Sequence, residues 1–229
     1  MCPLECLPHR RAILKSSVAF AASFSALAAG GLAISTFAPS AAAADLSWVI
    51  GPQPGFTPEV GTLVSMLAFT RGQVLANVQG LSMADLDWLL DAKANTIGAL
   101  LLHLAATETF YAANTFNGAK WDAMPAELKK KWDVPMNLDE PARQAIKGHP
   151  LEYYLDALHT SRENTLTGLR KVDDKWLATV TTEENFSSNN YGKWFHVAEH
   201  ESNHDGQIKF LKSRVPGAAG GAGVMPTKK

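Results

Sequence analysis

The sequence predicts an all-α protein built as a four-helix bundle, with a long connection between its second and third main helices. Two observations predict this class. Apolar residues recur at three- and four-residue steps in four separate segments, the spacing that places side chains on one face of a helix. The chain also shows no convincing alternation of apolar and polar residues of the kind that half-buried strands need. Long helices joined by connections of mixed length pack as bundles.

The first segment begins at Thr57-Pro58-Glu59. Thr57 can cap a helix, proline suits the first helical position, and Glu59 favours the positive end of the helix dipole. Gly80 supplies a stop signal. The apolar stripe between these signals consists of Val60, Leu63, Val64, Leu67, Val74, Leu75 and Val78.

The second main helix is predicted over residues 95–114. A short helix precedes it, because Ser82 is followed three residues later by Asp85, and this helix is expected to run through Leu90. His103 lies within the apolar stretch of the second main helix. The apolar face of that helix consists of Ile97, Leu100, Leu101, Leu104 and Tyr111.

Residues 116–148 interrupt the helical pattern with two glycines and three prolines. We expect a long connection that contains short helical pieces, such as residues 125–132. Long connections in compact domains often cover functional sites.

Two further helices follow this connection. The third starts near Pro150, and its stripe consists of Leu151, Tyr154, Leu155, Leu158, Thr165, Leu166 and Leu169. Residues 179–191 are polar and rich in turn formers. The fourth runs over residues 193–214, until Pro216-Gly217 ends it. Its inward line is Val197, His200, His204, Ile208 and Leu211.

The amino-terminal residues 1–44 have the anatomy of an export signal. Basic residues precede an apolar run over residues 18–38, and Ala41 to Ala44 offer a cleavage site. The pair Arg10-Arg11 followed by Ala-Ile-Leu-Lys resembles a twin-arginine signal, which implies an exported, periplasmic protein. The alternative is an uncleaved membrane anchor; after cleavage no stable membrane span is expected. Residues 45–56 then form a linker, residues 57–215 the bundle, and residues 216–229 a disordered Gly/Ala-rich tail.

Charge and cysteine content narrow the function. The chain carries 21 basic and 22 acidic residues and has a net charge of -1, with no basic patch, so we expect no nucleic acid among its partners. Its two cysteines, Cys2 and Cys6, would leave with the signal. The mature protein would then have neither a disulfide nor a cysteine nucleophile.

Histidines carry the chemistry. His196, His200 and His204 recur at four-residue intervals, so their side chains share one helical face. Since His200 and His204 align with the apolar stripe, they should point inward and can hold one metal ion together. His103 can supply a third ligand from the second helix, although a lone core histidine is more often only hydrogen-bonded. For His196, a fourth ligand, a residue supporting the ligands and a surface position all stay open; the last two are favoured.

The segment His200-Glu-Ser-Asn-His204-Asp-Gly-Gln207 resembles the closing helix of DinB/YfiT-like proteins, in which His-x-x-x-His is followed by x-Gly-Gln. Asn95 to Gly98, leading to His103 with Glu108 beyond, resembles the second helix of that family. The resemblance implies an up-and-down-related four-helix bundle that is often dimeric, so a homodimer is one expectation. It also implies one divalent metal on His103, His200 and His204. Several relatives use small thiols, others are assigned as hydrolases, and many have no assigned activity.

An ion on three neutral imidazoles keeps one position open and can lower the pKa of bound water or of a thiol. Zinc is the first choice, with nickel, iron or manganese as alternatives. We therefore expect a metal-dependent hydrolase or thiol S-transferase that acts on a small molecule. The alternatives are a non-catalytic metal-binding or stress-response protein of the envelope and a haem carrier without a Cys-x-x-Cys-His motif. The candidates for supporting or acid/base roles are Gln207, Glu108, Glu199 and His196, with Glu201 and Asp205 beside them.

Overall fold

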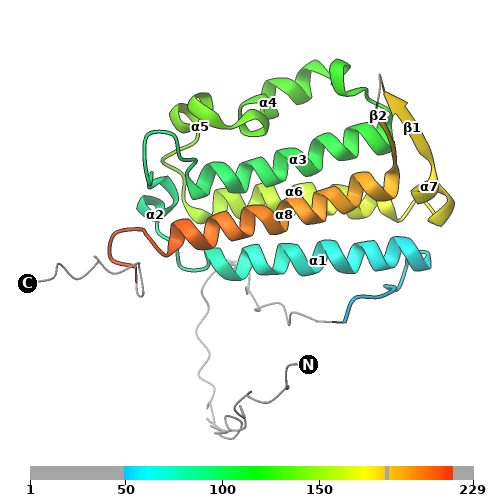
Figure 1. The fold of residues 1–229 in the computed structure, drawn as a ribbon, viewed down its shortest axis with the longest axis horizontal. Helices are drawn as coiled ribbons and strands as arrows, with labels where there is room; N and C mark the ends of the chain where they lie inside the picture. The colour runs from blue at the N-terminus through cyan, green and yellow to red at the C-terminus, as the bar shows by residue number, and fades with distance from the viewer. Residues whose placement is uncertain (1–48, 184–185, 219–229) are drawn as a thin grey trace, which may run out of the picture. The chain divides into compact units, whose positions relative to one another are not determined.

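The computed structural model describes residues 49–183 and 186–218; the expected export signal and most of the expected tail lie outside these ranges. The described chain is mostly helical, which confirms the all-α class (Figure 1). The four long helices are α1 (Pro58–Val78), α3 (Ile97–Asn117), α6 (Leu151–Leu169) and α8 (Asn190–Lys212). The shorter elements are α2 (Met83–Asp87), η1 (Trp121–Ala123), α4 (Ala126–Asn137), α5 (Asp139–Ala145), α7 (Asp174–Ala178), β1 (Val180–Glu183) and β2 (Phe186–Asn189).

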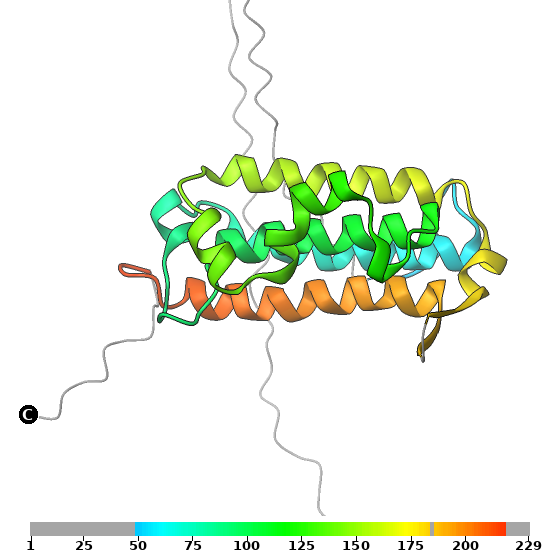
Figure 2. The same cartoon turned by 90° about the horizontal axis from the view of Figure 1, so that it is seen from above.

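The long helices form two parallel pairs, α1 with α8 and α3 with α6, so their order differs from that of a simple up-and-down bundle. Along the second pair, Gly98 lies against Tyr154 and Phe116 lies against Gly168, so residue numbers rise together. Two consecutive long helices that run parallel need a connection that travels back along the bundle. Helices α4 and α5 make that return, and Figure 2 shows them lying over α3 between α6 and α8. The long connection is thus a second layer that covers α3.

Helix α1 is capped differently from the sequence prediction. Thr57 does occupy the N-cap position, but its side chain caps nothing and donates a hydrogen bond to Asp174. The carboxylate of Asp174 instead accepts from the amides of Glu59 and Val60, at 3.0 and 3.1 Å. Asp174 lies in α7, far away in sequence, so the first turn of α1 is held by a tertiary contact.

Local capping signals set the other helix starts. Ser82 and Asp85 form the expected capping box of α2, although this helix ends at Asp87 rather than at Leu90. The side chain of Thr96 accepts a hydrogen bond from the amide of Ala99 at the start of α3, at 3.0 Å. Helix α3 continues to Asn117, three residues beyond its expected end at residue 114.

The segment expected to be polar and turn-rich contains a small hairpin that the sequence analysis missed. Strands β1 and β2 pair antiparallel, with Val180 opposite Asn189. The strands consist largely of Thr, Ser and Asn and are mostly exposed, so they carry no apolar alternation. The buried Lys193 joins the hairpin to α3, because its Nζ donates to the hydroxyl of Thr181 at 2.9 Å and to Asn114 at 2.8 Å.

The core follows the predicted stripes. One cluster lies at the α2 end of the bundle and another at the α7 end, where Trp194 is fully buried. Before α1, the backbone of Gln53 lies so close to Gly61 that a Cβ at residue 61 would sit 2.4 Å from the Gln53 nitrogen. Within residues 49–183 and 186–218, no helix has the length and apolar character needed to cross a membrane.

Candidate metal centre

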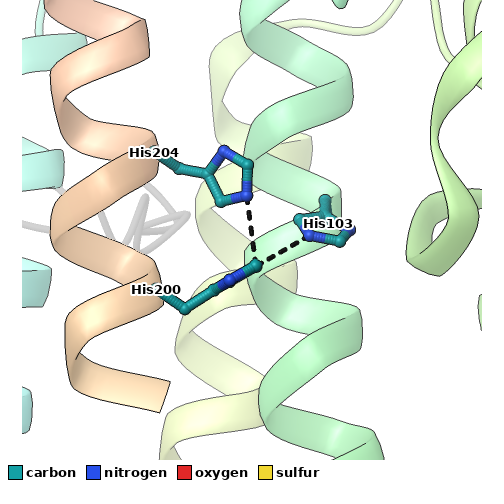
Figure 3. A group of neighbouring side chains, drawn as sticks. All are labelled: His103, His200 and His204. Atoms are coloured by element: carbon teal, nitrogen blue, oxygen red, sulfur yellow. Dashed lines mark hydrogen bonds between the residues drawn. The ribbon is translucent and has the colours of Figure 1, made fainter. Parts of the chain in front are cut away.

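Three histidines meet where α3 faces α8. His103 comes from α3, and His200 and His204 occupy successive turns of α8, so their rings converge (Figure 3). The Nε2 atom of His200 lies 2.8 Å from Nε2 of His103 and 3.1 Å from Nε2 of His204. The three rings each offer one nitrogen, and these nitrogens all lie within 4.8 Å of one another. The arrangement suits a single cation.

Hydrogen bonds on the far side of two rings determine which nitrogens are free. Nδ1 of His103 lies 2.9 Å from the carbonyl oxygen of Pro135, which can only accept, so this nitrogen carries the proton. Nδ1 of His204 lies 3.1 Å from Oε1 of Gln207, and the same assignment applies. When these rings are neutral, both therefore point an Nε2 lone pair at Nε2 of His200. His200 can donate to only one of them, so a bound cation would satisfy the group better than internal hydrogen bonds do.

Burial keeps the three rings neutral. It lowers the pKa of His103 from 6.5 to about 4, with the nearby His204 adding to the effect. It lowers the pKa of His200 to about 3, again with a contribution from His204. The pKa of His204 is also lowered, chiefly by burial. Neutral imidazole is the form that binds metal, so the site does not need to lose protons at neutral pH before it binds.

The covering helix α4 supplies the partner of His103. The last four carbonyls of a helix have no partner within the helix, and Pro135 is the third residue from the end of α4. Its carbonyl is therefore available to accept from His103. Pro135 is buried, and α4 runs antiparallel to α3, because Met124 before its start packs with Phe110 whereas Pro135 near its end contacts His103. The connection predicted to cover a functional site thus contacts the histidine cluster directly.

The other candidates have different surroundings. Gln207 contacts His204 as described, whereas both carboxylate oxygens of Glu108 accept from arginines in the bundle interior. Glu199 is exposed and lies beside His196, with 3.4 Å between the carboxylate and the ring. His196 is itself exposed, and its ring centroid lies 5.4 Å from that of His200. Solvent reaches the cluster from this side, because His200 is only partly buried while His103 and His204 are buried.

A buried ion-pair network lies beside the histidines, and its two arginines were not predicted from the sequence. Glu108 and Glu201 pair there with Arg71 and Arg162, and all four side chains are buried. The signal was present in the sequence. Arg71 continues the apolar stripe of α1 four residues after Leu67, so a charge stands where the spacing predicts a core position. Arg162 stands likewise four residues after Leu158 in the stripe of α6.

Fold and site together define a class of protein: a four-helix bundle with a largely buried three-histidine cluster that can hold one divalent cation. Comparison with family models matches residues 62–217 to the family described as mycothiol-S-transferase. Because this match spans most of the chain, the protein belongs to the mycothiol S-transferase family, within the DinB/YfiT-like superfamily. No curated protein matches the chain.

Proposed function

We propose that the protein is a divalent-metal-dependent thiol S-transferase whose metal is held by His103, His200 and His204. One observation carries this proposal: three Nε2 atoms of neutral imidazoles converge without enough protons to satisfy one another. Zinc is the metal we favour, since imidazole and an open position suit it. Membership of the mycothiol S-transferase family favours thiol transfer over hydrolysis.

A divalent cation on three neutral ligands supplies a strong local positive charge, which lowers the pKa of a thiol that approaches it. The residues of the chain prepare this site. Pro135 and Gln207 hold the proton of each ring they contact on Nδ1, which leaves Nε2 free. Burial of His103 and His204 excludes water from the inner side, while the more exposed His200 side admits the substrate.

The proposed reaction joins a small thiol to an electrophilic carbon. The thiol loses its proton to solvent, sulfur forms a bond to carbon, and a leaving group departs with the electrons of its former bond. The name of the family indicates mycothiol as the first thiol to try. The mature chain needs no cysteine of its own for this chemistry, because the nucleophilic sulfur comes from the substrate.

We further propose that the protein works outside the cytoplasm. The support is the arrangement of Arg10-Arg11, the apolar run and the alanine-rich site in residues 1–44. Sequencing the amino terminus of the exported protein tests this: a start near residue 45 supports it, and a start at Met1 in the membrane fraction contradicts it.

Elemental analysis and a thiol-transfer assay test the central proposal. The purified full-length chain should contain about one equivalent of metal, and His103→Ala, His200→Ala and His204→Ala should each lose most of it. His159→Ala, which removes an exposed histidine of α6, is the matched control and should retain it. With mycothiol and chlorodinitrobenzene, formation of the thioether and release of chloride should follow metal content across these variants.

The outcomes separate the candidate functions. Metal in the wild type without transfer from any thiol would leave a non-catalytic metal-binding protein of the envelope. A wild type that binds no divalent metal, or triad variants that retain it, would contradict the metal centre itself.

A further inference from the structure

A closed cycle of four charged side chains lies inside the bundle beside the histidine cluster. Each long helix contributes one member: Arg71 from α1, Glu108 from α3, Arg162 from α6 and Glu201 from α8. Arg71 donates through Nη2 to Glu108 at 2.7 Å and through Nε to Glu201. Arg162 donates through Nε to Glu108 at 2.7 Å and through Nη2 to Glu201 at 3.1 Å. Every arginine therefore bridges both glutamates, and the four formal charges cancel.

The cycle also ties adjacent backbones together. Nη1 of Arg71 donates to the carbonyl oxygen of Leu158 in α6, and Nη1 of Arg162 donates to that of Leu67 in α1, both at 2.6 Å. Two hydroxyl groups also donate hydrogen bonds to the glutamates. The hydroxyl of Thr70 donates to Glu201 at 3.1 Å, and that of Ser161 donates to Glu108 at 3.3 Å. Glu108 and Glu201 are 0% and 1% exposed, so no solvent is available to replace a lost partner.

The two glutamates stand on the helices that carry the histidines. Glu201 directly follows His200, and Glu108 lies five residues after His103. Consecutive helical residues point about 100° apart, so Glu201 faces the bundle interior while His200 faces α3. Two facing carboxylates would repel each other, and α3 and α8 hold them together only because arginines from α1 and α6 lie between them. If α8 slipped along α3 by one turn, about 5.4 Å, the same movement would break the cycle and move the Nε2 atoms of the histidines apart.

We propose that Arg71, Glu108, Arg162 and Glu201 are positioning residues that fix the register of α8 against α3 and so align the three imidazoles for one cation. This inference rests on the proposed metal centre. Stability is a weak explanation for the cycle, because well-packed apolar residues often stabilise a core as well as buried ion pairs do. Directional hydrogen bonds do what apolar contacts do poorly: they specify one register among several of similar packing. A metal site needs its ligands placed to within about 0.5 Å.

Cobalt(II) titration of the full-length chain, followed by visible absorption, tests the proposal. The d–d bands report coordination geometry, and the titration gives the dissociation constant; urea unfolding of the metal-free protein gives stability separately. Arg71→Lys keeps the charge but cannot bridge two carboxylates with a fork of donors. We expect it to weaken cobalt binding at least tenfold and to alter the bands.

A second variant removes all four charges, Arg71→Met with Glu108→Leu, Arg162→Met and Glu201→Leu. It leaves no unpaired buried charge and should fold, yet bind cobalt at least tenfold more weakly with altered bands. The control is Leu177→Ala, which removes a fully buried side chain of α7. This control should lose stability and keep the wild-type affinity and spectrum.

The results distinguish two kinds of failure. If either folded variant binds cobalt with the wild-type affinity and spectrum, the positioning role is wrong. If the fourfold variant does not fold, the result for Arg71→Lys is the test. If Leu177→Ala weakens binding as much as Arg71→Lys does, general destabilisation explains the loss and the proposal also falls. If the wild type itself binds no cobalt, the metal centre is wrong.

Discussion

The most direct test of the buried cycle is how the free energy of unfolding changes when the pH is lowered. Burial alone would raise the pKa of Glu108, but Arg162 and Arg71 outweigh it and lower the pKa from 4.5 to about 2. Between these values the unfolded chain binds a proton that the folded chain does not. Stability from this group is therefore complete above pH 4.5 and is lost as the pH falls toward 2.

The size of the effect follows from the pKa difference. A depression from 4.5 to about 2 corresponds to roughly 3 kcal/mol of the free energy of unfolding. Titration between the two states removes about 2 kcal/mol of this by pH 3. The Glu108→Gln variant, which leaves the two guanidiniums short of one negative charge, should lose about 3–5 kcal/mol at pH 7.

Urea unfolding at pH 7, 5 and 3, followed by tryptophan fluorescence, measures this. The gap in unfolding free energy between wild type and Glu108→Gln should narrow by about 2 kcal/mol between pH 7 and pH 3. Because both proteins contain the other acid-titrating groups, including the histidine cluster, the contributions of those groups cancel in the difference between the two unfolding free energies. Glu163→Gln, an exposed change on α6, should stay within about 0.5 kcal/mol of wild type throughout. A gap that stays constant from pH 7 to pH 3 would refute the reasoning.

Three further predictions concern metal, packing and capping. Zinc at a hundredfold excess over its dissociation constant should stabilise the wild type by about 2.7 kcal/mol and leave His200→Ala unchanged, as seen in thermal melts; equal shifts in both would contradict a specific site. Gly98→Ala should destabilise by about 1–3 kcal/mol in urea melts, because the new Cβ would sit 2.7 Å from the buried Tyr154 ring. The matched Gly206→Ala, with no atom within 4 Å, should gain up to about 1 kcal/mol instead, and the same sign for both would refute the packing argument. Asp174→Ala should lower the melting temperature and speed amide hydrogen exchange in the first turn of α1. Unchanged exchange there would show that Asp174 does not stabilise the start of the helix.

The long helices could be predicted because their signals are local. Apolar spacing marks one face of each helix, and turn or capping residues mark the ends, so α1, α3, α6 and α8 were all found near their observed bounds. The start of α1 shows the limit. Its sequence offers Thr57 as a cap, but Asp174 of α7 takes that role, and this proximity arises only once the chain has folded.

The hairpin escaped prediction for a different reason. Val180 is 64% exposed and Phe186 is 71% exposed, so β1 and β2 bury too little to impose a two-residue pattern. The two strands are held by pairing with each other and by the hydrogen bond that Lys193 donates to Thr181. A sequence pattern reports burial, and a segment that is ordered without being buried leaves little trace in it.

The histidines could be grouped from the sequence, but their protonation could not. Four-residue spacing places His200 and His204 together, and the apolar surroundings of His103 suggest that it faces inward. The proton on Nδ1 of His103 is fixed by the carbonyl of Pro135, which is a backbone atom. Any residue type supplies such an atom, so no sequence pattern can reveal it.

One topological fact links the cover, the cycle and the cluster. Because α3 and α6 run parallel, the chain must return between them, and the end of α4 reaches His103 as a consequence. The same parallel pairing sets Arg162 of α6 level with Glu108 of α3, and Arg71 of α1 level with Glu201 of α8. The antiparallel pairs are level at the same depth, since Arg71 also contacts Glu108 and Arg162 also contacts Glu201. The carbonyl of Pro135, by contrast, comes from the return segment that the parallel pairing requires. The long connection therefore supplies the hydrogen-bond partner of His103, and it also completes the core through the buried Ala142 and Ile146.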